Sequence, residues 1–237
     1  KSLSWSELSL FERSSEDHRK RYIDGEQTPS TPQQEFGSLI HKTIDDPKFP
    51  WLKELVISGR PLKEQGVARK ILDGVEKRRA PEREVFLRVE YKDIPLVAVY
   101  DGLDRENRIL HEYKTSAGKY WNQRTVDHHG QLSFYALVYN LLFHSYFREI
   151  QLHRLNTTKG FVKTFYTARG PLDLIRIGDR IKKCYQELKH QGLWELRKSK
   201  RDREMEAKKS QPSFFDVPVG SEESASSLAS QSILGAS

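Results

Sequence analysis

The sequence is poor in cysteine, and this scarcity excludes several classes of site. Cys184 is the single cysteine among 237 residues. One thiol can form neither an internal disulfide nor the thiolate set of a zinc ribbon or an iron–sulfur cluster. We therefore interpret Cys184 as an ordinary core or surface residue of a protein in a reducing compartment.

Long apolar runs are also missing. No segment approaches the roughly 20 apolar residues that a membrane span needs, and residues 1–7 do not have the character of a signal peptide. We expect a soluble, cytoplasmic protein that has no membrane partner.

Basic and aromatic side chains, in contrast, are plentiful. The net charge is +7 and the pI is about 9.3, which favours polyanionic partners such as nucleic acid, an anionic membrane or an acidic protein. Charged residues make up 31% of the chain, which is polar for a globular protein, but 4 Trp, 10 Tyr and 11 Phe argue against disorder.

Composition divides the chain into two unequal parts. Residues 1–197 carry the periodic apolar pattern of one domain. Residues 198–237 are first highly charged and then rich in Ser, Ala and Gly, which is typical of a flexible extension. Phe214, Phe215 and Val217 within it form a candidate docking peptide for a protein partner.

The pattern of apolar positions indicates an α/β protein. Helical spacing predicts helices over residues 3–24, 34–45, 63–79, 126–146 and 171–196. Short β-rich runs predict strands over residues 84–91, 96–103, 108–115, 148–156 and 161–167, with the last two forming a hairpin.

One segment, VAVYDGLDRENRILHEYKT at residues 97–115, carries the side chains that indicate chemistry. Asp101 lies near the end of its first strand, and Glu112 and Lys114 lie two residues apart on the second. Because side chains alternate along a strand, Glu112 and Lys114 share a face. A turn centred on Glu106–Asn107 puts Asp101 opposite Glu112, with Cβ atoms about 5 Å apart.

Two carboxylates at that separation repel each other in an apolar sheet, and a divalent cation would offset the repulsion. A metal that polarises a phosphoryl group and activates water, with an amine beside it, suits phosphodiester hydrolysis. An exposed hairpin with an ordinary Glu–Lys pair would show the same spacing. The spacing alone therefore leaves both interpretations open.

Four motifs in a fixed order add a family resemblance. GSLIH, YDGLD, EYKTS and QLSFY follow one another along residues 37–135. This ordered set resembles the RecB-like exonucleases of the PD-(D/E)XK superfamily, a branch that includes the exonucleases of CRISPR adaptation. The resemblance covers roughly residues 1–195. It implies a restriction-endonuclease-like core, in which helices flank a mixed central β-sheet and an N-terminal helical part precedes it.

The resemblance also implies roles for individual residues. Asp101 and Glu112 would hold Mg²⁺ or Mn²⁺ together with His41 and the backbone carbonyl of Tyr113, and Lys114 would assist the attacking water. Gln131 and Tyr135 would face the site, where they contact DNA or orient Lys114. Further candidates are an upstream acidic residue, Glu84, and the nucleic-acid-binding residues Lys119, Tyr120, Trp121 and Arg124. His128 and His129 are interpreted as surface or DNA-proximal residues.

The chain departs from the family pattern in one respect. Many members carry four cysteines for an iron–sulfur cluster, one near the first helix, where this chain has Ser14 and Ser15, and three near the C-terminus. We therefore expect a member without the cluster, whose C-terminal region is held by packing alone.

Three functions from different classes are compatible with these observations. The first is a metal-dependent deoxyribonuclease, an exonuclease that acts on DNA ends or single strands. The second is a non-catalytic nucleic-acid-binding subunit with the same fold. The third is a basic helical adaptor, which predicts that no β-hairpin forms across residues 96–115.

Overall fold

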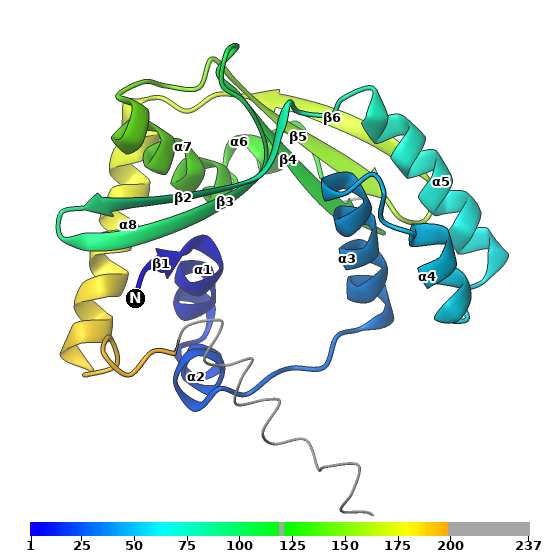
Figure 1. Ribbon diagram of the computed structural model, residues 1–237. Helices are drawn as coiled ribbons and strands as arrows, with labels where there is room; N and C mark the ends of the chain where they lie inside the picture. The colour runs from blue at the N-terminus through cyan, green and yellow to red at the C-terminus, as the bar shows by residue number, and fades with distance from the viewer. Residues whose placement is uncertain (119–120, 199–237) are drawn as a thin grey trace, which may run out of the picture.

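The computed structural model describes residues 1–118 and 121–198, and within them a mixed six-stranded sheet carries helices on both faces (Figure 1). The strands are β1 Leu3–Ser4, β2 Glu82–Tyr91, β3 Ile94–Asp104, β4 Ile109–Ser116, β5 Glu149–Asn156 and β6 Phe161–Thr167. The helices are α1 Trp5–Arg13, α2 Ser15–Arg19, the π-helical turn η1 Lys20–Asp24, α3 Pro32–Asp45, α4 Trp51–Ile57, α5 Leu62–Glu76, α6 Gln123–Asp127, α7 Gly130–Phe143 and α8 Pro171–His190.

The central strands follow the order β3-β4-β5-β6, and β2 covers the outer edge of β3. Only the β4–β5 and β1–β3 pairs are parallel; the other described pairs are antiparallel. The expected mixed sheet flanked by helices is confirmed. The β3–β4 hairpin also contradicts the helical-adaptor interpretation, which required its absence.

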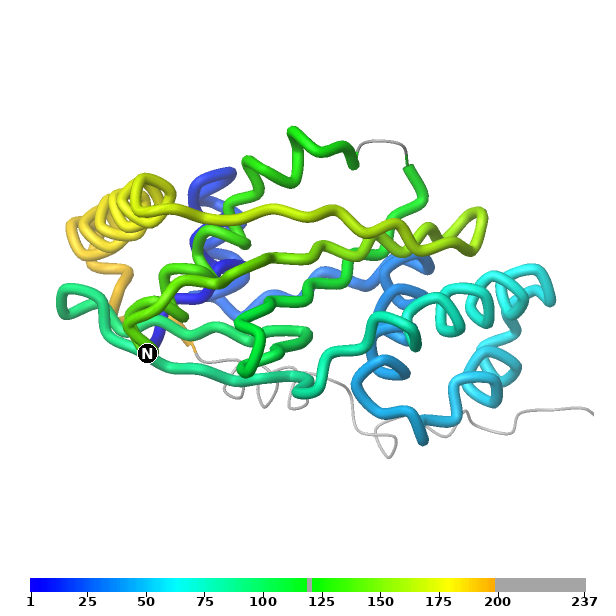
Figure 2. Tube along the Cα trace, turned by 90° about the horizontal axis from the view of Figure 1, so that it is seen from above, coloured from blue at the N-terminus to red at the C-terminus, as the bar shows by residue number. Residues whose placement is uncertain are grey.

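Helices on the two faces enclose separate apolar clusters. One cluster lies between the sheet and α1, α7 and α8, and includes Tyr100, Leu110 and Tyr135. The other lies between the sheet and α3 and α5, and includes Phe36 and Tyr113. Figure 2 shows the same division from above, with α3 to α5 at one end and α8 at the other. Strands β4 and β5 therefore contribute side chains to both layers.

The edge of β3 that faces β4 is shared between two neighbours. β1 pairs with it at residues 96–97, and β4 pairs with it at residues 102–104. The β4 register is the one that a turn centred on Glu106–Asn107 requires, so that expectation is confirmed. Asp101 lies in the gap between the two paired stretches, which leaves its side chain free to reach toward β4.

Along β3, the alternation of side chains between the two faces of the sheet shifts by one residue near Asp101. Ala98 and Tyr100 belong to the α7-side cluster, and so does Leu103. On β2, the position that would pair with Asp101 is Glu84, which drops out of the ladder and has a left-handed backbone with φ 47°. The register is the same on both sides of Glu84, so no residue is inserted, but a left-handed non-glycine residue costs roughly 1–2 kcal/mol. Such distortions concentrate at functional sites.

Several predicted helices have different bounds. The helix expected over residues 3–24 begins as the short strand β1 and breaks at Ser14, whose extended backbone and side chain cap α2. The helix expected over residues 126–146 is divided into α6 and α7 by the turn at His128–His129. The last helix ends at His190, before Gly192 with φ 65°, and α4 was not predicted.

A buried charge network joins the two ends of the described chain. The Arg197 guanidinium, with 2% of the residue exposed, donates to Glu7 Oε1 at 3.0 Å and to the Lys1 carbonyl oxygen. The guanidinium also lies 3.5 Å from the centroid of the Trp194 ring. His18 Nε2 lies 3.1 Å from the same Glu7 oxygen. The expectation that packing alone holds the C-terminal region is therefore wrong.

Among the described residues, no helix combines the length and the apolar character that crossing a membrane requires. The predicted docking peptide at Phe214, Phe215 and Val217 lies outside the described residues, as does all but the first residue of the predicted 198–237 extension.

Candidate active site

The sheet brings together the three side chains that the hairpin pattern singled out. Asp101 Oδ2 accepts a hydrogen bond of 2.8 Å from the backbone N–H of Tyr113, the residue after Glu112. Glu112 is 1% exposed, and its Oε1 lies 2.6 Å from Lys114 Nζ. The two carboxyl groups and the amine thus meet where β3 and β4 separate.

Burial and charge perturb the pKa values of Glu112 and Lys114 on β4. Burial raises the pKa of the Glu112 carboxyl, and the neighbouring Asp101 charge raises it further, against the opposing effect of Lys114. Burial alone would lower the pKa of Lys114, but the charges of Glu112 and Asp101 outweigh it and raise that pKa. Burial and the Asp101 charge thus disfavour a second negative charge on Glu112 unless a cation offsets it.

The remaining oxygen of Glu112 is suited to a cation. Glu112 Oε2 is buried and has no hydrogen-bond partner among the described residues, a costly state for a carboxylate. Carboxylate oxygens are ligands that Mg²⁺ and Mn²⁺ accept. Within residues 1–118 and 121–198, no three His, Cys, Asp or Glu side chains are already grouped as a metal site, so binding a cation at Glu112 Oε2 would require further ligands to move toward it.

Helix α3 packs against this part of the sheet through a glycine. A Cβ atom on Gly37 would lie 2.7 Å from Thr115 Oγ1, so only glycine lets the helix approach β4 this closely. His41, one turn later, lies within electrostatic reach of Asp101 and Lys114. Burial lowers its pKa first, and Lys114 adds to this effect while Asp101 opposes it. A neutral imidazole is the form that binds a metal.

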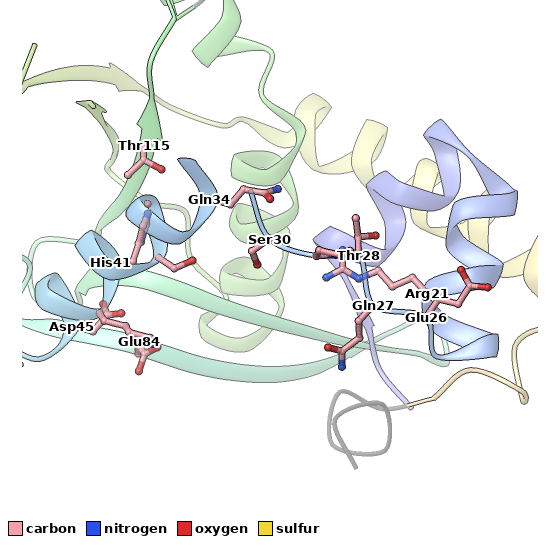
Figure 3. A pocket seen from close by; sticks show the side chains of 14 residues that line it. Arg21, Glu26, Gln27, Thr28, Ser30, Gln34, His41, Asp45, Glu84 and Thr115 are labelled. Carbon is pink, nitrogen blue, oxygen red and sulfur yellow. The ribbon is translucent and has the colours of Figure 1, made fainter. Parts of the chain in front are cut away.

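Asp45 is a site residue that sequence reasoning missed. It follows His41 by four residues on α3 and therefore lies on the same helical face. Burial, then the charges of Glu84 and Asp101, raise the pKa of Asp45 to about 7. The spacing of four residues from His41 was the available signal. Glu84, the predicted upstream acidic residue, is exposed and lies beside Asp45 at the same end of the cleft (Figure 3).

Helix α7 contributes the predicted pair Gln131 and Tyr135, which lies near Glu112. The Gln131 side-chain amide donates to the Tyr135 hydroxyl at 2.8 Å, and both side chains are buried. The Tyr135 pKa is raised by burial and then by the Glu112 charge, which places this hydroxyl near the carboxylate. Tyr100 donates to the Tyr135 backbone carbonyl at 2.8 Å and so ties α7 to β3 beside Asp101. The structure therefore brings this predicted pair to the site.

The predicted nucleic-acid-binding residues are distributed differently. Lys119 and Tyr120 lie outside the described residues. Trp121 packs partly buried against the core, with its ring centroid 5.3 Å from that of His129. Arg124 is exposed on α6.

His129 is more buried than the surface interpretation predicted. The surface interpretation holds for His128, which is exposed. Burial, then the charges of Lys114 and Arg169, lower the pKa of His129 to about 4. The buried Arg169 guanidinium donates to the carbonyl oxygens of Val126 and His129 and thereby fixes the turn that leads into α7.

A cleft of about 740 Å³ borders the site on the α3 side. His41, Asp45, Glu84 and Thr115 line one end, and the connection between η1 and α3 lines the rest. Figure 3 shows these side chains in an extended arrangement rather than a closed ring. A substrate can therefore reach the carboxyl cluster from solvent along an elongated surface.

This arrangement combines an oxygen-rich cation position, a neighbouring amine, a neutral imidazole and an open approach. Those are the groups that hydrolysis of a phosphodiester requires. A reaction that needs a thiol nucleophile is not supported. Burial, aided by the charges of Glu7 and Glu12, raises the pKa of Cys184 on α8 to about 12.

Comparisons with known proteins give the family of the chain and a protein of similar fold. The sequence model of the PD-(D/E)XK nuclease superfamily matches residues 2–210. No curated protein sequence matches the chain. A crystal structure from Eubacterium rectale, named "Putative exonuclease", is similar over 92% of this chain and 93% of its own, with a TM-score of 0.59 and 12% sequence identity. At that identity the similarity shows the fold alone.

Proposed function

This chain belongs to the PD-(D/E)XK nuclease superfamily, and from that premise we propose that it is a Mg²⁺- or Mn²⁺-dependent deoxyribonuclease that acts as an exonuclease on DNA ends or single strands. The observation that carries the proposal is the meeting of Asp101, Glu112 and Lys114 at the fork between β3 and β4. Family membership supports a nuclease, and the net charge of +7 favours a polyanionic substrate.

We assign the cation to the carboxylates of Asp101 and Glu112, with His41 and the Tyr113 carbonyl as further ligands. Nucleases of this superfamily typically use Mg²⁺ or Mn²⁺. A bound divalent cation lowers the pKa of water and neutralises charge on the phosphoryl oxygens. The unpartnered Oε2 of Glu112 supports this assignment.

The chain's own residues supply the remaining functions. Lys114 is released from Glu112 and uses its ammonium group to orient the attacking water and to stabilise negative charge on the phosphate. Gln131 and Tyr135 hold each other by a hydrogen bond of 2.8 Å and thereby shape the wall that positions Lys114. Glu84 and Asp45 add negative charge beside the cation position.

The proposal is tested by incubating end-labelled linear, circular and single-stranded DNA with the protein in Mg²⁺, Mn²⁺ or EDTA. We expect metal-dependent loss of linear and single-stranded DNA, with circular duplex spared. Lys114→Ala should lower the rate by at least a hundredfold, as expected for loss of a group that acts on the transition state. Lys163→Ala, on β6, is the matched control and should retain activity.

Equal inertness of the wild-type protein and Lys114→Ala, with DNA binding intact in both, would overturn the nuclease proposal in favour of a non-catalytic binding subunit. Cleavage of circular duplex DNA at the rate of linear DNA would instead overturn the exonuclease part alone.

We also propose that residues 1–197 form the nuclease domain and that residues 198–237 extend from it as a docking segment for a protein partner. The family match supports the first part, although it runs past this boundary to residue 210. Deletion of residues 211–237 should leave metal-dependent cleavage unchanged; loss of cleavage would contradict this division.

A further inference from the structure

The cleft beside the carboxyl cluster extends well beyond the groups that chemistry requires. Its far end is lined by residues of η1 and of the connection that leads into α3, including Arg21, Glu26 and Gln27. Figure 3 shows the cluster of His41, Asp45 and Glu84 at one end and these residues at the other. The cleft volume of about 740 Å³ falls in the range of specific ligand sites, roughly 300–1,000 Å³.

The middle of the cleft is lined by short side chains that can both donate and accept hydrogen bonds. They are Thr28, Ser30, Gln34 and Ser38. No Phe, Tyr or Trp of the described chain lines it. Base stacking needs an aromatic platform, whereas hydroxyl and amide groups bind phosphate and sugar oxygens. The surface is therefore suited to a sugar–phosphate backbone and not to splayed bases.

Arg21 provides a positive charge at the far end. Arg21 is exposed, and its guanidinium makes no ion pair within the part of the chain that the structure describes. The guanidinium lies 5.8 Å from the centroid of the Tyr22 ring, which is buried. That contact holds the cation at the cleft and leaves its donors available, and a guanidinium matches a phosphate in geometry. Glu26, at the same end, opposes it electrostatically.

We propose that this cleft is a binding site for the backbone of one nucleic-acid strand, with Arg21 contacting a phosphate remote from the bond that is cut. The inference rests on the proposed function and adds two properties to it. The site takes a single strand, because a cleft of this size accommodates a few linked nucleotide units and not a duplex. It is indifferent to sequence, because phosphate and sugar contacts carry no base information.

Binding is measured by fluorescence anisotropy of labelled single-stranded and duplex oligonucleotides, with the full chain in EDTA so that nothing is cut. Arg21→Ala should weaken single-strand binding about three- to tenfold, equally for oligo-dT and mixed sequences, and should lower the salt slope by about 0.7. Glu26→Gln should strengthen binding. Arg19→Ala is the matched control, since it removes the same charge two residues away and Arg19 does not line the cleft.

A small substrate separates this inference from the proposed function. Bis(p-nitrophenyl) phosphate with Mn²⁺ reaches only the carboxyl end, so Arg21→Ala should hydrolyse it at the wild-type rate and show a raised KM only on single-stranded DNA. If the wild-type protein hydrolyses neither substrate, the proposed function fails. If it hydrolyses both, but Arg21→Ala binds DNA like wild type or no more weakly than Arg19→Ala does, the strand site is overturned. Tighter binding of duplex than of single strand would also overturn it.

Discussion

At the scale of single residues, a buried histidine pair beneath the site makes the fold sensitive to acid. His153 is fully buried; its Nε2 lies 3.0 Å from His111 Nδ1, and its Nδ1 lies 2.9 Å from Thr164 Oγ1. Burial, then His111 and Arg78, lower the pKa of His153 to about 3. The unfolded chain, with an ordinary histidine pKa near 6.5, therefore binds a proton that the folded chain excludes between these two values.

Because the unfolded chain binds this extra proton, we predict that the free energy of unfolding falls as the pH falls from about 6.5 toward 3. Each pH unit in that window costs roughly 1.4 kcal/mol for His153 alone. Urea unfolding at pH 7, 6 and 5 should show a shallower loss in His153→Gln than in wild type. His190→Gln, at the exposed end of α8, should keep the wild-type slope. Identical slopes for His153→Gln and wild type would contradict this account.

The sequence predicted some site residues and missed others for a physical reason. One turn position and the two-residue period of strands suffice to bring Asp101 toward Glu112. Asp45, which was missed, lies on a helix and approaches the cluster only through tertiary packing. Glu84 was predicted from the family resemblance, but its distorted position on β2 was not. The surface prediction for His129 was wrong because its environment includes Arg169, which lies 40 residues away in the sequence.

At the scale of secondary-structure elements, the approach of α3 to β4 decides where His41 lies. We predict that Gly37→Ala separates the two, because the added Cβ would meet Thr115 Oγ1 at 2.7 Å. A displacement of this kind should lower kcat about ten- to a hundredfold.

A double-mutant cycle measures this contact directly. Gly37→Ala combined with Thr115→Ala should recover most of the activity, because the next atom, Thr115 Cβ, would be at an ordinary distance of 3.5 Å. Gly66→Ala on α5, where no atom lies within 4 Å of the new Cβ, is the control and should be fully active. Additive effects of the two substitutions would show that the contact does not set the helix position.

Sequence patterns predicted the elements unevenly. The β5–β6 hairpin and the β3–β4 register followed from local turn and alternation signals. Short α4 was missed, and the N-terminal helix was drawn as one piece although Ser14 interrupts it. Capping at Ser14 and the parallel pairing of β1 with β3 depend on contacts that a local pattern does not contain.

At the scale of the whole molecule, buried charge joins the two ends of the described chain. We predict that Arg197→Ala destabilises the protein by about 3–5 kcal/mol, because it leaves the 4%-exposed Glu7 without its main charge partner. Arg180→Ala removes a different arginine, which links α8 to α1 through the partly exposed Glu12. This change should cost no more than about 1 kcal/mol. Urea unfolding of both variants checks the difference; similar losses would contradict it.

The central claim is that Asp101 and Glu112 together hold a divalent cation, and calorimetric titration with Mn²⁺ tests it most directly. Wild type should bind one Mn²⁺, and Asp101→Asn and Glu112→Gln should each lose at least tenfold in affinity. Lys114→Ala should still bind the ion, since removing the amine frees Glu112 Oε1, although cleavage is lost. No binding to wild type, or equal binding by wild type and Glu112→Gln, would contradict the account.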